Sequence, residues 1–337
     1  MWTRRSGGRS ARGMAAKWPS FREQLLLQRS PRKGILRAKG SIVSGIPMPH
    51  ESASSPPLSR RAWLRATAAV GVGLPTVVAT DALVVTPSWL DTTALTFAAG
   101  GGQPTASDAT APAARLLQLS DLHMKQLGRL EEQLLATVNA SPPDLLLFTG
   151  DAIDTVAGFD VFAEFLSACP RESMPIGILG NWEYHSGIAP SRLARLYEQH
   201  GGRLLVNDGL EVETPGGPLM VTGLDDLVEG RPQVAAAQRR GGRAPHLLLA
   251  HCPAQRDQLG SAVSGGVDLI LSGHTHGGQV SPFGIALVTP GGSGRYVRGW
   301  YRDPGPPMYV SRGLGTSTLP IRLGVTPELV ALRWSLA

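Results

Sequence analysis

Cysteine is scarce in this sequence. The 337 residues include only two, Cys169 and Cys252, too few for a disulfide scaffold or for a zinc or iron–sulfur site built from thiolates. Aromatic residues are also few, at 6%, but apolar residues reach 42%, which is enough for a sizeable core. The composition therefore excludes a chain that is disordered throughout, and the length allows one large domain or two smaller ones.

The sequence also lacks a basic body, although its formal net charge is +6. Residues 1–65 hold 14 of the 32 Lys and Arg residues but only 2 of the 26 Asp and Glu residues, so the remainder of the chain is net acidic. A surface that binds nucleic acid needs clustered positive charge to pair with the phosphates. The charge distribution therefore argues against long nucleic acid as a partner of the folded part.

The first 80 residues divide into two parts. Residues 1–58 are rich in Arg, Ser, Gly and Pro without a helical or strand period, which predicts a disordered basic leader, with Met48 as an alternative start. Residues 59–80 join the pair Arg60-Arg61 to 15 uncharged residues and resemble a twin-arginine export signal. The uncharged stretch is shorter than the roughly 20 apolar residues of a membrane-spanning helix.

This resemblance implies recognition by the twin-arginine export machinery. The protein would then lie in the periplasm or on the extracytoplasmic face of the membrane. The signal would be either cleaved or kept as an anchor with peripheral membrane contact. The alternative is an ordinary basic patch in front of a buried helix.

From residue 81 onward the pattern is that of a folded chain. Residues 81–113 contain β-prone runs at Leu83–Val85 and Leu95–Phe97, followed by a Gly/Pro-rich linker. Over residues 114–337, short apolar strands alternate with amphipathic helices, which predicts an α/β domain with sheet buried on both faces. We expect strands at 116–119, 144–148, 176–179, 247–250 and 267–271, and helices at 128–138 and 190–200.

Polar side chains follow five of these strands, at the edge where open α/β sheets bind ligands. Each fragment alone has a structural explanation: an Asp-x-His can cap a helix, and a single histidine can be a satisfied core residue. Five together indicate a site for a divalent metal, because Asp, Asn and His are all suitable ligands. The residues are Asp121 and His123, Asp151 and Asp154, Asn181 and Glu183, His251, and His274 and His276.

The ordered blocks Asp-x-His, Gly-Asp-x-x-Asp, Gly-Asn-x-Glu, His-x-Pro and Gly-His-Thr-His resemble the calcineurin-like metallophosphoesterase superfamily. The exported bacterial branch, which includes UDP-2,3-diacylglucosamine pyrophosphatases, is the most similar, through blocks such as 222–226 and 311–315. The resemblance implies an α/β fold, a four-layer α/β/β/α sandwich of two mixed sheets. It also implies two divalent metal ions, each Mn, Fe or Zn.

The resemblance further assigns roles within the site. One metal would be held by Asp121, His123 and His276, the other by Asn181, His251 and His274, with Asp151 bridging the two. A metal-bridged hydroxide would attack phosphorus, which makes Asp151, Asn181 and His251 catalytic. Glu183 and Asp154 would instead support the loops.

Trp182 departs from the family pattern, which usually has a histidine there to protonate the leaving oxygen. Its absence favours a substrate with a good leaving group, such as a pyrophosphate. Trp182 would then contact the substrate, and His185 is either a substitute acid or a solvated loop residue. Arg295 and Arg298 either bind an anionic substrate or belong to a solvated loop.

Several functions fit these motifs. The first is hydrolysis of a phosphoester or pyrophosphate in a phosphorylated small molecule or a lipid-linked substrate, of which UDP-2,3-diacylglucosamine is one candidate. The alternatives are a phosphodiesterase for small nucleotides and a non-catalytic metal-binding scaffold. A protein Ser/Thr phosphatase is disfavoured, because Asp154 is followed by Thr155 and not by arginine. The presence of all seven expected ligands favours an enzyme.

Overall fold

A computed structural model describes residues 75–99, 112–238, 244–260, 266–302 and 304–336. All of them belong to the unit Leu58–Ala337. The predicted leader at 1–58 and most of the predicted signal at 59–80 lie outside the described residues. Within the described ranges, no helix combines the length and apolarity that crossing a bilayer would require.

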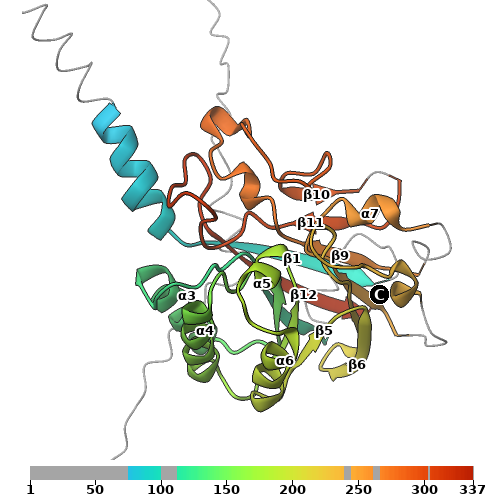
Figure 1. The fold of residues 1–337 in the computed structure, drawn as a ribbon. Coiled ribbons are helices and arrows are strands. Elements are labelled where there is room, and N and C mark those ends of the chain that lie inside the picture. Colours follow the sequence, from blue (N-terminus) through green and yellow to red (C-terminus); the bar gives the residue numbers. More distant parts are fainter. Residues whose placement is uncertain (1–74, 100–111, 239–243, 261–265, 303, 337) are drawn as a thin grey trace, which may run out of the picture. The chain divides into compact units, whose positions relative to one another are not determined.

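Twelve strands form two six-stranded sheets over the described chain (Figure 1). The first has the order β1-β12-β2-β3-β4-β5, in which β12 pairs antiparallel with β2 while the other neighbours are parallel. Its strands are β1 Asp91–Ala99, β2 Ala114–Leu119, β3 Leu145–Thr149, β4 Met174–Ile178, β5 Arg203–Leu205 and β12 Glu328–Leu336.

The second sheet has the order β10-β11-β9-β8-β7-β6 and is also mixed, with antiparallel pairs at both edges and parallel pairs between them. Its strands are β6 Asp208–Thr214, β7 Gly217–Gly223, β8 His246–Leu249, β9 Leu269–Ser272, β10 Gly299–Tyr301 and β11 Met308–Val310. Residues Leu145–Thr149 of β3 are all buried, as expected for a strand covered on both faces.

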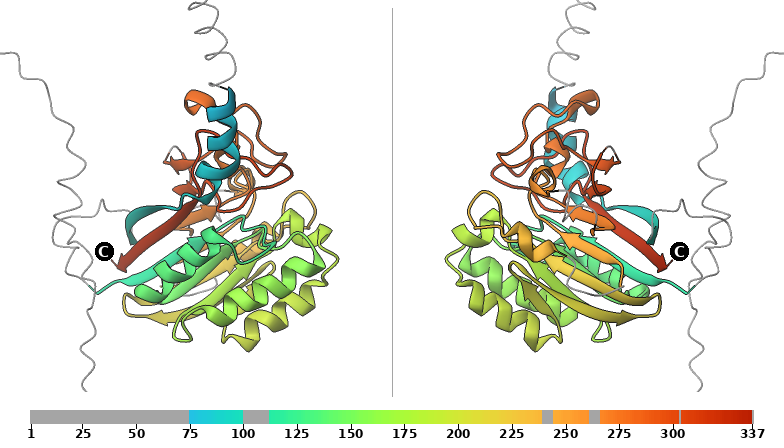
Figure 2. Two further views of the ribbon diagram at one scale, coloured as in Figure 1. Left: turned by 90° about the vertical axis from the view of Figure 1, so that its left-hand side faces the viewer. Right: turned by 90° about the vertical axis from the view of Figure 1, so that its right-hand side faces the viewer.

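Helices cover the outer faces of the sheets, and Figure 2 shows α3, α4 and α6 together on one side. One core lies between these helices and the first sheet, a second joins the two sheets, and a third lies on the outer face of the second sheet. The expected four-layer sandwich is confirmed. The helices are α3 Arg129–Ala140, α4 Val156–Ala168, α5 Asn181–His185, α6 Pro190–Gln199 and α7 Gln255–Gln258, with short η1 Asp81–Val85, η2 Thr86–Ser88, η4 Val234–Ala237, η5 His276–Gly278 and η6 Pro282–Gly284.

The sequence pattern explains most of these elements. In α3 the buried residues Leu130, Leu134 and Val138 recur every four positions and form one apolar face. The structure differs at Leu83–Val85, where the β-prone run is helical. Within η1 only Ala82 is buried, and the segment pairs with no strand of either sheet, so nothing rewards an extended backbone. The second β-prone run, Leu95–Phe97, does lie in a strand, β1, which pairs in parallel with β12.

Candidate metal centre

The predicted site residues meet where the two sheets present the carboxyl ends of their parallel strands. Asp121 and His123 follow β2, Asp151 follows β3, Asn181 begins α5 after β4, His251 follows β8, and His274 and His276 follow β9. Gln118 ties this edge together, since its buried Nε2 donates to Thr149 Oγ1 and to Ser272 O, both at 3.0 Å. The two sheets are therefore joined directly beneath the site.

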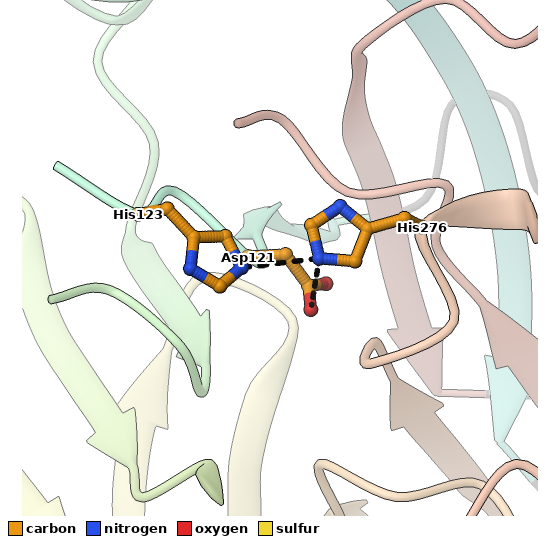
Figure 3. A group of neighbouring side chains, drawn as sticks. All are labelled: Asp121, His123 and His276. Carbon is orange, nitrogen blue, oxygen red and sulfur yellow. Dashed lines mark hydrogen bonds and ion pairs between the residues drawn. The ribbon is translucent and has the colours of Figure 1, made fainter. Parts of the chain in front are cut away.

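The first cluster consists of Asp121, His123 and His276, whose candidate ligand atoms converge (Figure 3). His123 Nε2 lies 3.0 Å from His276 Nε2, and that atom lies 3.5 Å from Asp121 Oδ1. All three side chains are buried. Two imidazoles and one carboxylate that converge in this way form a suitable ligand set for a divalent ion.

The second cluster consists of Asp151, His251 and His274. His251 Nε2 lies 3.2 Å from Asp151 Oδ2 and 3.1 Å from His274 Nδ1. Asn181 borders the same cleft, and its Oδ1 atom is buried without a hydrogen-bond partner in the described structure. A buried amide oxygen without a partner is costly, and a metal ion would satisfy it, so the residues fit the predicted ion.

Asp151 lies between the two clusters. Its Oδ2 atom is 3.8 Å from His123 Nε2 in the first cluster and 3.2 Å from His251 Nε2 in the second. Its Oδ1 atom accepts the backbone N–H of Trp182 at 2.9 Å. This is the position that the predicted bridging role requires, and the roles of the seven ligands in metal binding remain predictions.

Five of these residues have positive φ angles. The values are 54° for Asp121, 47° for His123, 53° for Asp151, 69° for His274 and 49° for His276. Such left-handed conformations cost about 1–3 kcal/mol each for residues other than glycine, and they cluster at functional sites. The surrounding hydrogen bonds hold this strain, including the bond from His274 N to Asp121 Oδ1 at 2.9 Å.

Two glycines permit the close packing of these loops. Gly150, at φ 90°, has no room for a side chain, because an added Cβ would collide with the His251 ring. At Gly273 an added Cβ would overlap Ser120 Oγ and crowd Asp121. The glycines beside the predicted ligands are therefore required by contacts between the loops as well as by their turns.

Supporting groups orient three of the imidazoles. Asp154 Oδ1 contacts His123 Nδ1, Thr149 O lies 2.8 Å from His251 Nδ1, and Gly291 O contacts His274 Nε2. Each contact favours a proton on that nitrogen and leaves the other ring nitrogen facing the cluster. We expected only a loop contact from Asp154, and its orienting contact with His123 depends on how the two loops pack.

The electrostatics of the clusters follow from burial and mutual proximity. Burial lowers the pKa of His276 and His274, and the neighbouring His123 and His251 act in the same direction, so both rings are neutral and able to bind a metal. Burial raises the pKa of Asp121, and the nearby Asp151 charge adds to this effect. For Asp151 burial opposes ionisation, but His251 and His123 outweigh it and lower its pKa.

Glu183 supports the site from below and does not contribute a candidate ligand atom. Its Oε2 atom accepts N–H groups from Gly180 at 2.7 Å and Asp151 at 2.9 Å. Its Oε1 atom accepts those of Ala152 at 2.6 Å and Ile153 at 3.2 Å. One buried carboxylate therefore joins the start of α5 to the Asp151 loop, in agreement with the supporting role expected from the sequence.

A cleft of about 460 Å³ opens beside the clusters. Asp151, Asn181 and Trp182 are among its lining residues, and contact of Trp182 with a substrate stays a prediction. The remaining wall is formed by His274 to His276, Gly278 to Val280, Leu287, Val288, Pro290 and Ser317 to Leu319.

Three predicted substrate-binding residues do not line this cleft. His185 Nε2 lies 3.3 Å from Glu229 Oε1, and its ring lies 5.9 Å from that of Trp182, so its role as a substitute acid stays a prediction. Arg295 lies over the ring of Tyr296, 4.8 Å from its centroid. The Arg298 guanidinium donates to Gly277 O at 2.8 Å and Gly284 O at 2.7 Å, which supports the loop and leaves the cleft to other residues.

Cys252 lies beside His251 but outside both clusters. It is fully buried, and its Sγ atom donates to Asp226 Oδ1 at 3.2 Å. Burial and the Asp226 charge raise the pKa of its thiol well above the ordinary value. Cys252 is therefore a packed, protonated thiol without a ligand role.

Comparison with known proteins agrees with this geometry. Residues 114–278 match the family model described as calcineurin-like phosphoesterase. The uncharacterized metallophosphoesterase YkuE of Bacillus subtilis is 32% identical over 224 residues, which cover 64% of this chain and 77% of YkuE. YkoQ of the same organism is 29% identical over 64% of this chain and 81% of YkoQ. The phosphodiesterase YaeI of Escherichia coli is 29% identical over 65% of this chain and 81% of YaeI.

The matched region spans every block from Asp121 to His276, and the fold and both ligand clusters are those of a metal-dependent hydrolase. The chain therefore belongs to the calcineurin-like phosphoesterase family and is a metal-dependent phosphoester hydrolase.

Proposed function

We propose that the protein hydrolyses a phosphodiester or pyrophosphate bond in a lipid-linked substrate, with UDP-2,3-diacylglucosamine as one candidate. The observation that carries the reaction type is the position of Asp151 between two Asp/His clusters at the side of one cleft. The apolar side chains of Leu287, Val288 and Leu319, which also line this cleft, support a substrate with an apolar part.

Two divalent ions supply, when bound, Lewis-acid polarisation of the phosphoryl group and an acidified water molecule. The chain holds them with groups from both sheets. Asp151 provides negative charge between the clusters, and Asn181 Oδ1 provides a neutral donor atom on the cleft side. Asp154 keeps the His123 ring turned so that its Nε2 atom faces the site.

The leaving group must depart without a proton from a dedicated imidazole. Among the side chains that line the cleft, the imidazoles are His274 and His276, and both belong to the predicted ligand set. Trp182 occupies the position of the family's usual histidine and carries only an indole N–H, which is not an acid. A phosphate or nucleotide leaving group, which is stable as an anion, fits this arrangement.

A panel assay tests the proposal. The purified chain, reconstituted with Mn, Fe or Zn, is given bis-p-nitrophenyl phosphate, p-nitrophenyl phosphate, an alkyl phosphate and a nucleotide-sugar pyrophosphate. We expect metal-dependent turnover that is fastest for the diester or pyrophosphate. Stoichiometric metal binding without turnover of any substrate would instead identify a non-catalytic scaffold. Preference for a short nucleotide diester would favour the nucleotide phosphodiesterase alternative.

We also propose that the twin-arginine machinery exports the protein to the periplasm or the extracytoplasmic face of the membrane. The support is the Arg60-Arg61 pair followed by 15 uncharged residues. This route carries folded proteins, which suits an enzyme whose metal ligands come from both sheets and are assembled only after folding.

A further inference from the structure

Exposed apolar side chains lie on two segments that contribute to the wall of the metal cleft, 280–290 and 317–319. We call these five residues the apolar rim: Phe283, Ile285, Leu287, Val288 and Leu319. Their exposed fractions are 102%, 68%, 61%, 77% and 57%, in the order given. Leu287, Val288 and Leu319 also line the cleft, so the rim and the cleft wall are continuous.

Hydrogen bonds join the segments that carry the rim. Gln279 Nε2 donates to Leu319 O at 2.9 Å, and Leu287 N donates to Val280 O at 3.2 Å. Arg322 N donates to Ala82 O at 2.9 Å, which attaches η1 to the segment that contains Leu319. The described chain begins with a helix over residues 75–85, which includes η1 and is called the N-terminal helix below. In Figures 1 and 2 this helix (blue) and the turn of η6 (orange) both project at the top of the described unit.

The N-terminal helix adds further apolar surface to this end. Leu83 is 51% exposed, Val84 62% and Val85 43%, and Trp89, just beyond η2, is 64% exposed. In the sequence, residues 66–80 contain no charged side chain. The sequence directly before the described residues is therefore as apolar and uncharged as the surface to which it leads.

Charge is absent from the rim segments. Residues 280–294 and 313–321 contain no Asp, Glu, Lys or Arg, although 17% of the chain is charged. Several exposed apolar side chains on uncharged segments beside a cleft form a candidate interaction surface. The rim segments themselves therefore offer no charge to an acidic or basic protein partner, and the guanidinium of the neighbouring Arg298 already donates to backbone carbonyls.

Phe283 is held outward at the tip of the rim. Its φ is 56°, in the left-handed region, and its side chain is fully exposed, so the fold gains no packing from it. Arg298 supports the turn, because its guanidinium donates to Gly277 O and Gly284 O. Backbone strain that persists without any packing of the side chain suggests a functional role, here the presentation of an aromatic ring to an interaction partner.

We propose that the apolar rim docks on a lipid bilayer, with the mouth of the metal cleft facing the lipid headgroups. A second copy of the chain on the rim would close the cleft to substrate, whereas a bilayer covers the same surface and still presents phosphate groups to it. The described residues 75–80, which are uncharged and lead directly into η1, are compatible with the same membrane surface. The inference goes beyond the proposed function and does not depend on turnover of a lipid.

Vesicle binding by the full chain tests the inference. The probe is a vesicle of phosphatidylethanolamine and phosphatidylglycerol in about 1 M salt, where a Debye length near 3 Å suppresses binding by the basic residues 1–65. The variant combines Phe283→Ser with Ile285→Ser, which lie outside the cleft lining. We expect its vesicle partition coefficient to fall at least about tenfold, because two exposed apolar side chains lose their burial.

The matched control combines Val156→Ser with Leu336→Ser, which are 51% and 43% exposed and lie outside the rim. The control and the wild type should bind vesicles equally. All three proteins should hydrolyse soluble p-nitrophenyl phosphate at the same rate, and this equal rate would show that the rim variant is folded. Equal vesicle binding by the rim variant and the wild type would overturn the inference. So would a wild-type dimer in solution that the rim substitutions convert to a monomer. Absence of turnover in all proteins would count against the proposed function alone.

Discussion

Glu183 offers a sharp test of how the site is built, because one buried carboxylate accepts four backbone N–H groups. The perturbation is Glu183→Gln, which keeps the size of the side chain but replaces one oxygen with an NH₂ group. In either orientation of the amide, its NH₂ group faces two of the four backbone N–H groups and cannot accept from them. These are the N–H groups of Gly180 and Asp151, or those of Ala152 and Ile153. The substitution therefore isolates the hydrogen bonds from the packing.

The magnitude follows from these contacts. Two hydrogen bonds to a charged group, at about 1.5–3 kcal/mol each, correspond to a loss of about 3–6 kcal/mol. Part of this loss of stability is recovered. Burial and the Asp151 charge raise the pKa of Glu183 to about 7, so they disfavour the carboxylate that the substitution removes. We expect the free energy of unfolding to fall by about 2–4 kcal/mol.

Glu131→Gln is the matched control. Glu131 occupies the same third position of α3 that Glu183 occupies in α5, and its Oε2 atom accepts the N–H of Gly128 at 3.0 Å. It touches no site loop and is only partly buried. The expected loss is at most about 1 kcal/mol.

The assays are urea unfolding of both variants without metal and a titration with Mn or Zn. Because Glu183 holds the N–H of Asp151, its loss should also weaken metal binding about 10- to 100-fold. Glu131→Gln should bind metal as the wild type does. Equal losses of stability in the two variants, with unchanged metal affinity in Glu183→Gln, would refute the assignment of Glu183 as the residue that positions the Asp151 loop.

Three further outcomes are expected. Asp151→Asn removes the negative charge between the clusters and should lower activity at least about 100-fold with reduced metal content, whereas Leu117→Ala in β2 should mainly cost about 2–5 kcal/mol of stability. A near-normal rate with full metal content in Asp151→Asn would contradict the bridging role. Arg60→Lys with Arg61→Lys keeps the charge but should leave the precursor in the cytoplasm on cell fractionation, and unchanged export would identify an ordinary basic segment. Trp182→His should accelerate hydrolysis of alkyl esters by a factor of up to about 10²–10⁴ and barely change that of aryl esters, which a plot of rate against leaving-group pKa measures. Equal wild-type rates for alkyl and aryl phosphates, with the chemical step rate-limiting, would contradict the leaving-group argument.

The candidate ligands could be found from the sequence because each one directly follows an apolar strand. Burial of a strand is a local property that hydrophobic runs record, and the carboxyl ends of parallel strands meet at one edge. His123 and His276 are 153 residues apart along the chain, yet their Nε2 atoms lie 3.0 Å apart. The residue types at the strand ends therefore predicted a metal site before any distance was known.

The contacts of Arg298 and His185 could not be predicted from the sequence. A basic side chain in a Gly-rich loop has the same sequence signature whether it faces a substrate or a backbone carbonyl. Arg298 donates to Gly277 O and Gly284 O, and His185 lies beside Glu229, because the backbone brings these partners next to them. Loop packing has no periodicity, so the sequence left both alternatives open.

The sequence by itself determined the alternation of strands and helices, the acidic body, and the identity of the side chains at the strand ends, since these depend on local composition and spacing. Only the tertiary structure decided that Asp151 lies between both clusters, that Asn181 Oδ1 has no partner among the described residues, and that Phe283 is exposed. The physical reason is that these features arise from strand pairing and loop contacts between residues far apart in the chain. Such contacts depend on the backbone path, including the positive φ angles at the site, which residue type alone does not encode.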